Sequence, residues 1–323
     1  MGGQNRKAEL LEQEAHRWIT MLISGEATAH DAEALKRWCT QSPSHASAFA
    51  DATRRWKDFG LAGSDWLEGQ VTYRQVLARR RMNRRAIVGG AGALAAAAAS
   101  YAIVSPPFGL WPSLEEWRAD YRTVTGEQRK IVLAGDVSVQ MNTQSSIAFH
   151  SANDAYGLKL IAGEASFLAS SQMQKPLVVF AADGRTLASR ARFDVRNLQS
   201  DVCVTCLEGE VRVEQGTEAT IVGANRQVRY GKDGLAPPVT IDPVQAAAWQ
   251  NGVLIFRLTP LTDVIAEINR YRPGKVILIN ASLARRTLSG RFHIQNMDEV
   301  LVWVEQALDA RSRSLPGGIV LLG

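Results

Sequence analysis

Residues 79–105 read RRRMNRRAIVGGAGALAAAAASYAIVS, and this stretch divides the chain of 323 residues into two parts. Five arginines stand in its first seven positions, and they are Arg79, Arg80, Arg81, Arg84 and Arg85. Residues 86–105, which follow them, contain no charged side chain. A helix over residues 86–105 spans about 30 Å, the thickness of the hydrocarbon core of a bilayer. The stretch therefore predicts one transmembrane helix over residues 86–105.

The arginines also predict the direction in which the chain crosses. By the positive-inside rule, residues 1–85 lie in the cytoplasm and residues 106–323 lie across the membrane. Arg84-Arg85 with the apolar residues after them also look like a twin-arginine export signal. The pattern leaves two alternatives open, an ordinary arginine-flanked anchor and a buried helix of a soluble protein.

The charge of the chain is concentrated at this boundary. The formal net charge is +5 and the isoelectric point is about 9.2. Residues 1–85 hold 14 Lys and Arg against 10 Asp and Glu, whereas residues 106–323 hold 23 against 22. Nucleic-acid binding requires basic residues spread over a docking surface, so no direct nucleic-acid partner is expected. A hydrophobic content of 46% excludes a wholly disordered chain, and three cysteines exclude a disulfide scaffold.

The part before the arginines, residues 1–85, reads as a small all-α domain. Apolar residues at helical spacing predict helices from about Lys7 to Ser24, after Thr28, after Ser42-Pro43 and over about residues 64–82. Trp18, Trp38 and Trp56 fall once per helix at apolar positions. They are expected to form the core, although a bundle this short also leaves room for packing against a protein partner.

The part after the membrane segment is predicted to contain a linker, a β domain and an α+β module. Residues 106–120 read as the linker, and a period-two pattern over residues 121–243 predicts an all-β sandwich or β-roll. A Gly-Glu step occurs at 126–127, 163–164 and 209–210, which predicts turns between strands with glutamate as a turn acceptor. Prolines in residues 235–243 read as a linker to the module at 244–323, whose predicted order β-α-β-β-α-β suggests a split-βαβ arrangement.

No pattern in the sequence predicts catalysis or a cofactor. The histidines, at 16, 30, 45, 150 and 293, are too far apart in the sequence to suggest a metal site. Nucleophile-elbow, zinc-protease and phosphate-loop motifs are absent. Cys203 and Cys206 form a CxxC, but in a predicted strand residues three apart face opposite sides and cannot bridge. The chain is therefore expected not to be an enzyme.

Several stretches together resemble the FecR family of inner-membrane sigma-factor regulators. The first is EAHRWITMLISGEATAHDAEALKRWCTQSPSHASAFADATRRW at 14–56. The second group is TVTGEQRKIVLAGDVSVQMNTQSSI at 123–147, LIAGEASF at 160–167, RFDV at 192–195 and LEGEVRV at 207–213. The last stretch, residues 249–301, begins WQNGVLIFRLTPLTDVIAEINRYRPG. Their shared order around one membrane segment carries the resemblance over nearly the full chain.

The resemblance implies an anti-sigma factor of the bacterial inner membrane, with its N-terminus in the cytoplasm and its C-terminus in the periplasm. It implies two partners, an extracytoplasmic-function sigma factor and the signalling domain of a TonB-dependent outer-membrane transporter, usually one for a ferric siderophore. The module at 244–323 is similar to the short domain of secretins and of the transporters themselves, and an exposed strand edge there is a plausible recognition mode. The residues implied for sigma-factor binding are Trp18, Leu22, Trp38, Phe49 and Trp56. Those implied for transporter binding are Leu254, Phe256, Leu258, Leu261 and Phe292.

The chain departs from the family at a site of self-cleavage. Some members cut themselves at a Gly-Thr bond before an RF(D/N)V-like strand, and here Arg190-Ala191 occupies that position. Alanine has no hydroxyl to attack the preceding carbonyl, so we expect no self-cleavage. Purification without proteases should yield one intact chain, and two fragments divided at Arg190 would contradict this prediction.

Two other functions remain open from the sequence. One is a cell-envelope binding or assembly module anchored by the transmembrane helix, which needs no sigma factor. The other is an envelope enzyme whose catalytic residues come from distant segments. Co-purification of a sigma factor distinguishes the first from the family interpretation, and metal analysis with active-site labelling would reveal the second.

Overall fold

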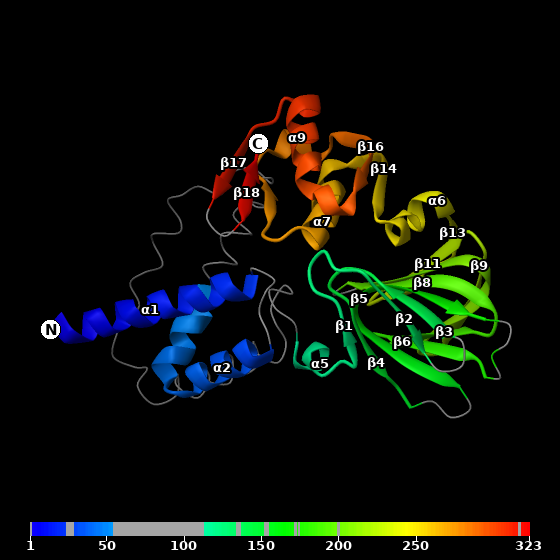
Figure 1. Cartoon of the computed structure of the whole chain (residues 1–323), viewed down its shortest axis with the longest axis horizontal. Helices are drawn as coiled ribbons and strands as arrows, with labels where there is room; N and C mark the ends of the chain where they lie inside the picture. The colour runs from blue at the N-terminus through cyan, green and yellow to red at the C-terminus, as the bar shows by residue number, and fades with distance from the viewer. Residues whose placement is uncertain are drawn as a thin grey trace. The chain divides into compact units, whose positions relative to one another are not determined.

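The computed structural model describes residues 2–23, 29–53, 113–133, 137–151, 155–170, 173, 175–198, 201–315 and 318–323 (Figure 1). These residues form two compact units. The first comprises Met1–Leu114, Gly274–Arg286 and Glu305–Gly323, and the second comprises Glu115–Pro273 and Thr287–Val304. The expected transmembrane segment and its arginines lie outside the described residues. Of the helices that are described, none is both long and apolar enough to cross a bilayer.

The N-terminal residues of the first unit are helical, as predicted. Helix α1 is Gly2–Ile23, α2 is Ala29–Thr40, and residues 43–53 form a further helical stretch. That stretch begins directly after Ser42, where the Ser-Pro step predicts a helix start. The expected fourth helix and Trp56 lie outside the described residues. The core of these helices consists of Ala15, Ile19, Leu35, Trp38, Cys39, Phe49 and Ala52.

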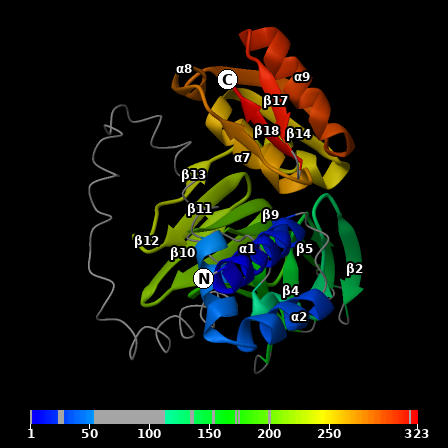
Figure 2. The same ribbon diagram turned by 90° about the vertical axis from the view of Figure 1, so that its left-hand side faces the viewer.

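The second unit contains the β domain, whose strands pair into two layers (Figures 1 and 2). The strands are β1 (Tyr121–Arg122), β2 (Arg129–Leu133), β3 (Val137–Met141), β4 (Ser146–Phe149), β5 (Tyr156–Ala169), β6 (Leu177–Ala181), β7 (Gly184–Ala188), β8 (Ala191–Leu198), β9 (Asp201–Gln215), β10 (Glu218–Gly223), β11 (Arg226–Gly231), β12 (Gly234–Leu235) and β13 (Val239–Thr240). One layer runs β1-β4-β5-β6-β7-β9-β10, and the other runs β2-β3-β5-β8-β9-β11. Strands β5 and β9 belong to both layers.

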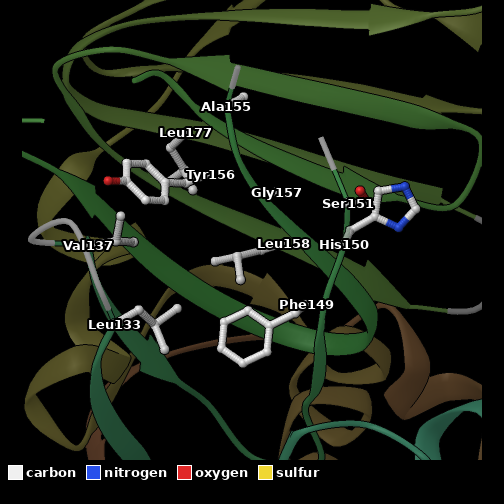
Figure 3. Close-up of a pocket in the computed structure, with 10 residues that line it drawn as sticks. All are labelled: Leu133, Val137, Phe149, His150, Ser151, Ala155, Tyr156, Gly157, Leu158 and Leu177. Carbon is white, nitrogen blue, oxygen red and sulfur yellow. The ribbon is translucent and has the colours of Figure 1, made fainter. Parts of the chain in front are cut away.

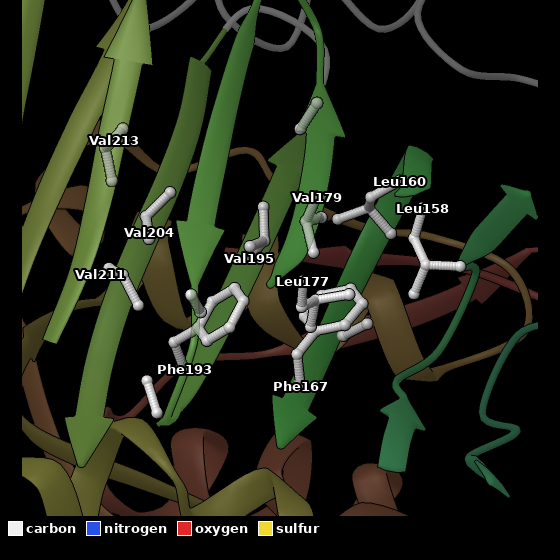
Figure 4. Close-up of a cluster of buried hydrophobic side chains, with 14 of the residues drawn as sticks. Leu158, Leu160, Phe167, Leu177, Val179, Phe193, Val195, Val204, Val211 and Val213 are labelled. Carbon is white, nitrogen blue, oxygen red and sulfur yellow. The ribbon is translucent and has the colours of Figure 1, made fainter. Parts of the chain in front are cut away.

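The prediction of an all-β domain, a sandwich or a β-roll, is confirmed in its β character, and the core of the domain has the predicted period of two. Along β3, Val137, Val139 and Met141 are buried while the residues between them are partly exposed. Phe167 of β5 and Phe193 of β8 stack at 5.4 Å between ring centroids in the middle of the core (Figure 4). The branched and aromatic side chains between the layers therefore supply the hydrophobic stabilisation of this domain.

Two of the three Gly-Glu steps are not turns, which corrects the prediction. Gly126 does lie in a turn, but Gly163 and Gly209 lie inside the continuous strands β5 and β9. Both have positive φ, +89° and +76°, and each marks the point where its strand passes from one layer to the other. Glycine here therefore bends a strand instead of ending it.

The expected linker at 235–243 is also part of the sheet, so that prediction was wrong. Strand β13 pairs with β11, and the guanidinium of Arg226 donates to the carbonyl of Pro238 at 2.8 Å. Helix α6 (Pro243–Ala246) follows directly, with the Asp242 carboxylate accepting from the backbone N–H of Val244. The proline-containing segment therefore runs along the edge of the sheet and is held there by β11 and Arg226.

The C-terminal residues alternate strands and helices, but they do not form one split-βαβ sheet. The elements are β14 (Val253–Pro260), α7 (Leu261–Tyr271), β15 (Val276–Leu278), α8 (Ala281–Ala284), β16 (Thr287–His293), α9 (Met297–Leu308), β17 (Ser312–Leu315) and β18 (Ile319–Leu322). In the second unit β14 pairs with β16, and in the first unit β15, β18 and β17 form a separate sheet. Helix α8, capped by Asn280, lies between β15 and β16 in the chain and was not part of the predicted element order.

Candidate functional site

The N-terminal helices gather aromatic side chains around Trp38. The indole Nε1 of Trp38 donates to the Glu14 carboxylate at 2.9 Å, and the ring meets His45 edge-on at 4.9 Å between centroids. Trp18 lies 6.4 Å from Trp38 by ring centroids. The hydroxyl of Ser42 and Nδ1 of His45 are 2.8 Å apart. The cluster thus ties α1, α2 and the stretch over 43–53 together.

The residues expected to bind a sigma factor divide between this core and its surface. Phe49 has no exposed surface and Trp38 has 9%, so both support the helices from inside. Trp18 is half-buried and presents part of its ring to solvent. The side chain of Leu22 and the whole of Trp56 lie outside what the structure describes. Their role in binding stays a prediction.

In the second unit, a buried charged cluster joins the β sandwich to helix α7. The Arg270 guanidinium lies 2.7 Å from the carboxylate of Glu164 and 2.6 Å from that of Glu267. Arg196 of β8 also pairs with Glu267, at 3.0 Å. The side chains of Arg270 and Glu164 are each 10% exposed. We call Glu164, Arg196, Glu267 and Arg270 the ionic cluster.

Electrostatics keep both central members of the ionic cluster charged. Burial by itself raises the pKa of Glu164, but the positive charges of Arg270 and Arg196 outweigh burial and hold that pKa below its usual value. Burial disfavours the charge on Arg270, and the facing carboxylates of Glu164 and Glu267 more than compensate, so its pKa is raised. Arg270 and Glu164 are therefore a buried ion pair, which is costly to break from one side.

Hydrogen bonds from uncharged side chains extend the contact between the β domain and helix α7, which we call the junction, on both sides of the ionic cluster. The Asn142 side-chain amide donates to the carboxylate of Glu164 at 2.8 Å and to the hydroxyl of Tyr271 at 2.7 Å. The Thr143 hydroxyl donates to the backbone carbonyl of Arg270 at 2.8 Å. Two further bonds reach the residues before β14, from Gln128 to the Trp249 carbonyl at 2.9 Å and from Gln140 to the Gln250 carbonyl at 2.8 Å. Buried polar groups on this face are therefore satisfied across the junction.

Asp194 lies in the same layer of the sandwich and is 4% exposed. Its carboxylate accepts hydrogen bonds from Gln250 Nε2 at 3.0 and 3.1 Å and from the indole of Trp249 at 3.3 Å. Burial raises the pKa of Asp194 to about 7, and the negative charge of Glu164 contributes to the rise, against the hydrogen bonds from Ser166, Gln250 and Trp249. Asp194 is thus a buried acid that titrates near neutral pH.

The Asp194→Asn variant tests this assignment through the pH dependence of stability. Because the folded-state pKa lies above the unfolded value, the folded chain binds an extra proton between about pH 4 and 7. Asp194 therefore favours folding at pH 5.5 more than at pH 8, by roughly 2 kcal/mol. We expect Asp194→Asn to remove this difference, measured as urea unfolding midpoints at the two pH values.

The matched control for this prediction is Asp201→Asn, because Asp201 is an exposed carboxylate at the start of β9. It should leave the pH dependence as in the unchanged chain. If the urea midpoint of Asp194→Asn changes between pH 5.5 and pH 8 as much as that of the unchanged chain, Asp194 does not titrate in this range.

The residues expected to bind a transporter are mostly internal. Leu254, Phe256 and Leu261 are buried, with at most 6% of their surface exposed. Leu258 is 76% exposed and has a φ of +48° at an irregularity in β14, where its N–H donates to the Ser289 hydroxyl at 2.8 Å. Phe292 is half-buried and contacts Phe256 and Trp303. Of the five, Leu258 presents the most surface.

A hollow of about 300 Å³ opens at one end of the sandwich (Figure 3). Five of its ten lining residues are Leu133, Val137, Phe149, Leu158 and Leu177. Figure 3 shows the imidazole of His150 pointing away from these side chains. The lining is therefore largely apolar, with Ser151 and Tyr156 as its other polar side chains.

The cysteines and the metal-binding residue types form no site within the described residues. Cys203 and Cys206 are free, as the strand spacing predicts, and burial raises the pKa of the Cys206 thiol to about 11. A thiol of such high pKa is a poor nucleophile. Across the described ranges, His, Cys, Asp and Glu form no group of three that could hold a metal ion.

Comparison with known proteins identifies two domains of the chain. Residues 119–212 match the FecR protein family, and residues 13–54 match a domain of unknown function, DUF4880. Two crystal structures of a protein from Parabacteroides distasonis ATCC 8503, described as a candidate anti-sigma factor, share the fold. Both are 20% identical with a TM-score of 0.55, and they cover 63% and 62% of this chain and 97% and 96% of theirs. No curated protein sequence matches the chain.

The junction residues were not singled out by sequence reasoning. Asp194 appeared only as part of the RFDV stretch that resembles the family, and Glu164 only as a predicted turn acceptor in a Gly-Glu step. Arg270 lies in an ordinary helical pattern, and its partner is 106 residues away in the chain. A buried acid in a strand with apolar neighbours on both sides is the signal that points to such a contact.

Proposed function

We propose that this chain, which carries the domains of a FecR-type anti-sigma factor, is a single-pass signal transducer of the bacterial inner membrane. Its N-terminal helices bind an extracytoplasmic-function sigma factor in the cytoplasm. Its C-terminal residues receive the signalling domain of a TonB-dependent outer-membrane transporter, and the signal regulates genes for iron-siderophore uptake. The link to DNA is indirect, through the sigma factor.

One observation carries the proposal. The DUF4880 match at 13–54 and the FecR match at 119–212 lie on opposite sides of the uncharged segment 86–105 and its five arginines. A protein with one domain on each side of a membrane is suited to transmit a signal from the periplasm to a protein in the cytoplasm. A sigma factor is the partner that fits a regulator of this type.

Two structural features support protein partners at both ends. Trp18 leaves part of an aromatic ring exposed beside a tightly packed core, and aromatic side chains of this kind often anchor protein interfaces. In the C-terminal residues, Leu258 is exposed in a left-handed conformation that a leucine rarely adopts. Trp18 also packs against the helical core, so the exposed part of its ring is what remains available to a partner.

The test is co-purification of the tagged full-length chain from its host in mild detergent. We expect a sigma factor of the extracytoplasmic-function class among the retained proteins, identified by mass spectrometry. Trp18→Ala should reduce its recovery at least about tenfold, the effect of losing an interface anchor worth more than about 1.4 kcal/mol. Gln13→Ala, at an exposed position of the same helix, is the control and should retain the sigma factor.

Absence of any sigma factor from the unchanged chain would contradict the proposal. The chain would then fit the alternative of an anchored envelope-binding module. Reporter assays with the full-length chain and with residues 1–85 alone then determine whether binding inhibits or activates transcription.

A further inference from the structure

The three-stranded sheet of the first unit ends in an unpaired strand. Its order is β15-β18-β17, and among the described residues no strand lies on the far side of β17 (Figures 1 and 2). Four consecutive residues at this edge, 311–314, are exposed. A strand edge of this kind is a template for the addition of another strand.

The register shows which backbone groups are open on β17. Arg311 and Gly323 exchange both backbone hydrogen bonds, at 2.6 and 2.9 Å, so they form a hydrogen-bonded pair. Bonded and non-bonded pairs alternate along an antiparallel ladder. The N–H and C=O groups of Ser312 and Ser314 therefore point away from β18. They offer an added strand four hydrogen-bonding groups.

The side chains along this edge differ between the two faces of the sheet. Arg311 and Arg313 project on the face that carries partly exposed Leu321. Ser312 and Ser314 project on the other face, opposite the buried Leu322 and Val320. In an added strand, every second side chain would lie beside Arg311 and Arg313. The side chains between them would lie on the other face, beside Ser312 and Ser314 and near the apolar Leu322 and Val320.

Charge identifies the complementary partner. In Gly274–Arg286 and Glu305–Gly323 there are five basic residues, Lys275, Arg285, Arg286, Arg311 and Arg313, against two acidic residues, Glu305 and Asp309. Among the described residues, neither Arg311 nor Arg313 forms an ion pair. Two unpaired guanidinium groups two residues apart on one edge suit carboxylates at the same spacing.

We propose that β17 is the edge on which the outer-membrane transporter's signalling domain adds an extended strand, in which acidic side chains facing Arg311 and Arg313 alternate with apolar ones. The inference rests on the proposed function, because it takes the transporter as the partner. Backbone bonds to Ser312 and Ser314 supply the affinity, and the arginines select the register and the charge of the strand.

The tagged full-length chain is expressed in its host, the cell envelope is solubilised in mild detergent, and the tagged chain is purified. The measured quantity is the amount of TonB-dependent transporter that co-purifies with it. The double variant Arg311→Glu/Arg313→Glu should retain at least tenfold less transporter, and Arg311→Lys/Arg313→Lys should retain most of it. The matched control is Arg285→Glu/Arg286→Glu, which makes the same charge change in the same unit away from β17. It should retain transporter within about twofold of the unchanged chain.

Two further variants test strand addition separately from charge. Ser314→Pro removes one outward N–H while keeping the bonds between β17 and β18, and it should also lower retention at least tenfold. Hydrogen exchange of residues 319–322 checks that β18 stays paired in this variant. A photo-crosslinking residue at position 313 should capture the transporter, whereas one at position 291, in the other open strand β16, should not.

The outcomes separate this inference from the proposed function. If the unchanged chain retains no transporter, both fail. If it does retain the transporter, and the charge reversal and Ser314→Pro do too, then only the β17 assignment is overturned. Arginines also protect strand edges from random pairing, and that role alone would leave retention unchanged. Crosslinks from position 291 and none from 313 would likewise overturn it.

Discussion

Replacing Arg270 with methionine is expected to destabilise the second unit by about 3–5 kcal/mol, the usual cost of removing one partner of a buried ion pair. Methionine approximates the length of the arginine stem, so the loss comes mainly from the charge. Glu164 would keep the Asn142 hydrogen bond but lose the guanidinium at 2.7 Å. The measurement is urea unfolding of the purified chain, with hydrogen exchange of α7 (Leu261–Tyr271) as the local readout.

Two variants show whether the buried charge causes this loss. Adding Glu164→Gln to Arg270→Met should recover a large part of the stability, because no carboxylate is then left buried without its cation. Arg257→Met removes another ion pair of the C-terminal residues, between Arg257 and Asp242, whose arginine side chain is 59% exposed. It should cost less than about 1 kcal/mol. Equal losses from Arg257→Met and Arg270→Met would contradict the assigned role of the ionic cluster.

The local patterns of the sequence predicted several of the helices and strands and the all-β character of residues 121–243. Alternation in β3 predicted buried Val137 and Val139, and the spacing of α7 predicted the buried face formed by Leu261, Val264, Ile265 and Ile268. These properties depend on neighbours a few residues apart, which a single sequence displays. The two-layer β domain follows from many such strands and was predicted as a sandwich or β-roll.

Long-range pairing was not predictable in the same way. A glycine with positive φ, such as Gly163, fits a turn and also fits a bend inside a strand. Which of the two forms depends on the strands that pair with β5, and these are far away in the sequence. Likewise, the pairing of β14 with β16 and of β15 with β18 depends on contacts between segments far apart in the chain. The Arg270–Glu164 contact is of the same kind, so the junction became visible only in the structure.

The candidate partner-binding residues show a related limit. Apolar character selected Phe49, Phe256 and Leu261, and each is buried. An apolar residue in a sequence reports burial more often than binding, since the core needs far more such residues than an interface does. The exposed Leu258 and the open edge of β17 depend on a local backbone conformation and on sheet order, which composition does not reveal.

The second large effect is expected at Gly163, where strand β5 passes between the layers. A Cβ atom there would lie 2.4 Å from the Ser145 hydroxyl oxygen and 2.5 Å from the Gln144 carbonyl oxygen. A φ of +89° is unfavourable for any residue with a side chain. Backbone strain and overpacking together predict that Gly163→Ala lowers the free energy of unfolding by about 3–5 kcal/mol. Urea unfolding of the purified chain measures this change.

Two other glycines separate the causes of this loss. Gly216 has a φ of +57° but nothing within 4 Å of its added Cβ, so Gly216→Ala measures backbone strain alone and should cost about 1 kcal/mol. Gly223 has neither a positive φ nor a close neighbour, so Gly223→Ala should change stability by less than about 0.5 kcal/mol. If Gly163→Ala costs no more than Gly216→Ala, the close approach of Ser145 to β5 is not what requires glycine. The bend of β5 would then depend on its backbone conformation alone.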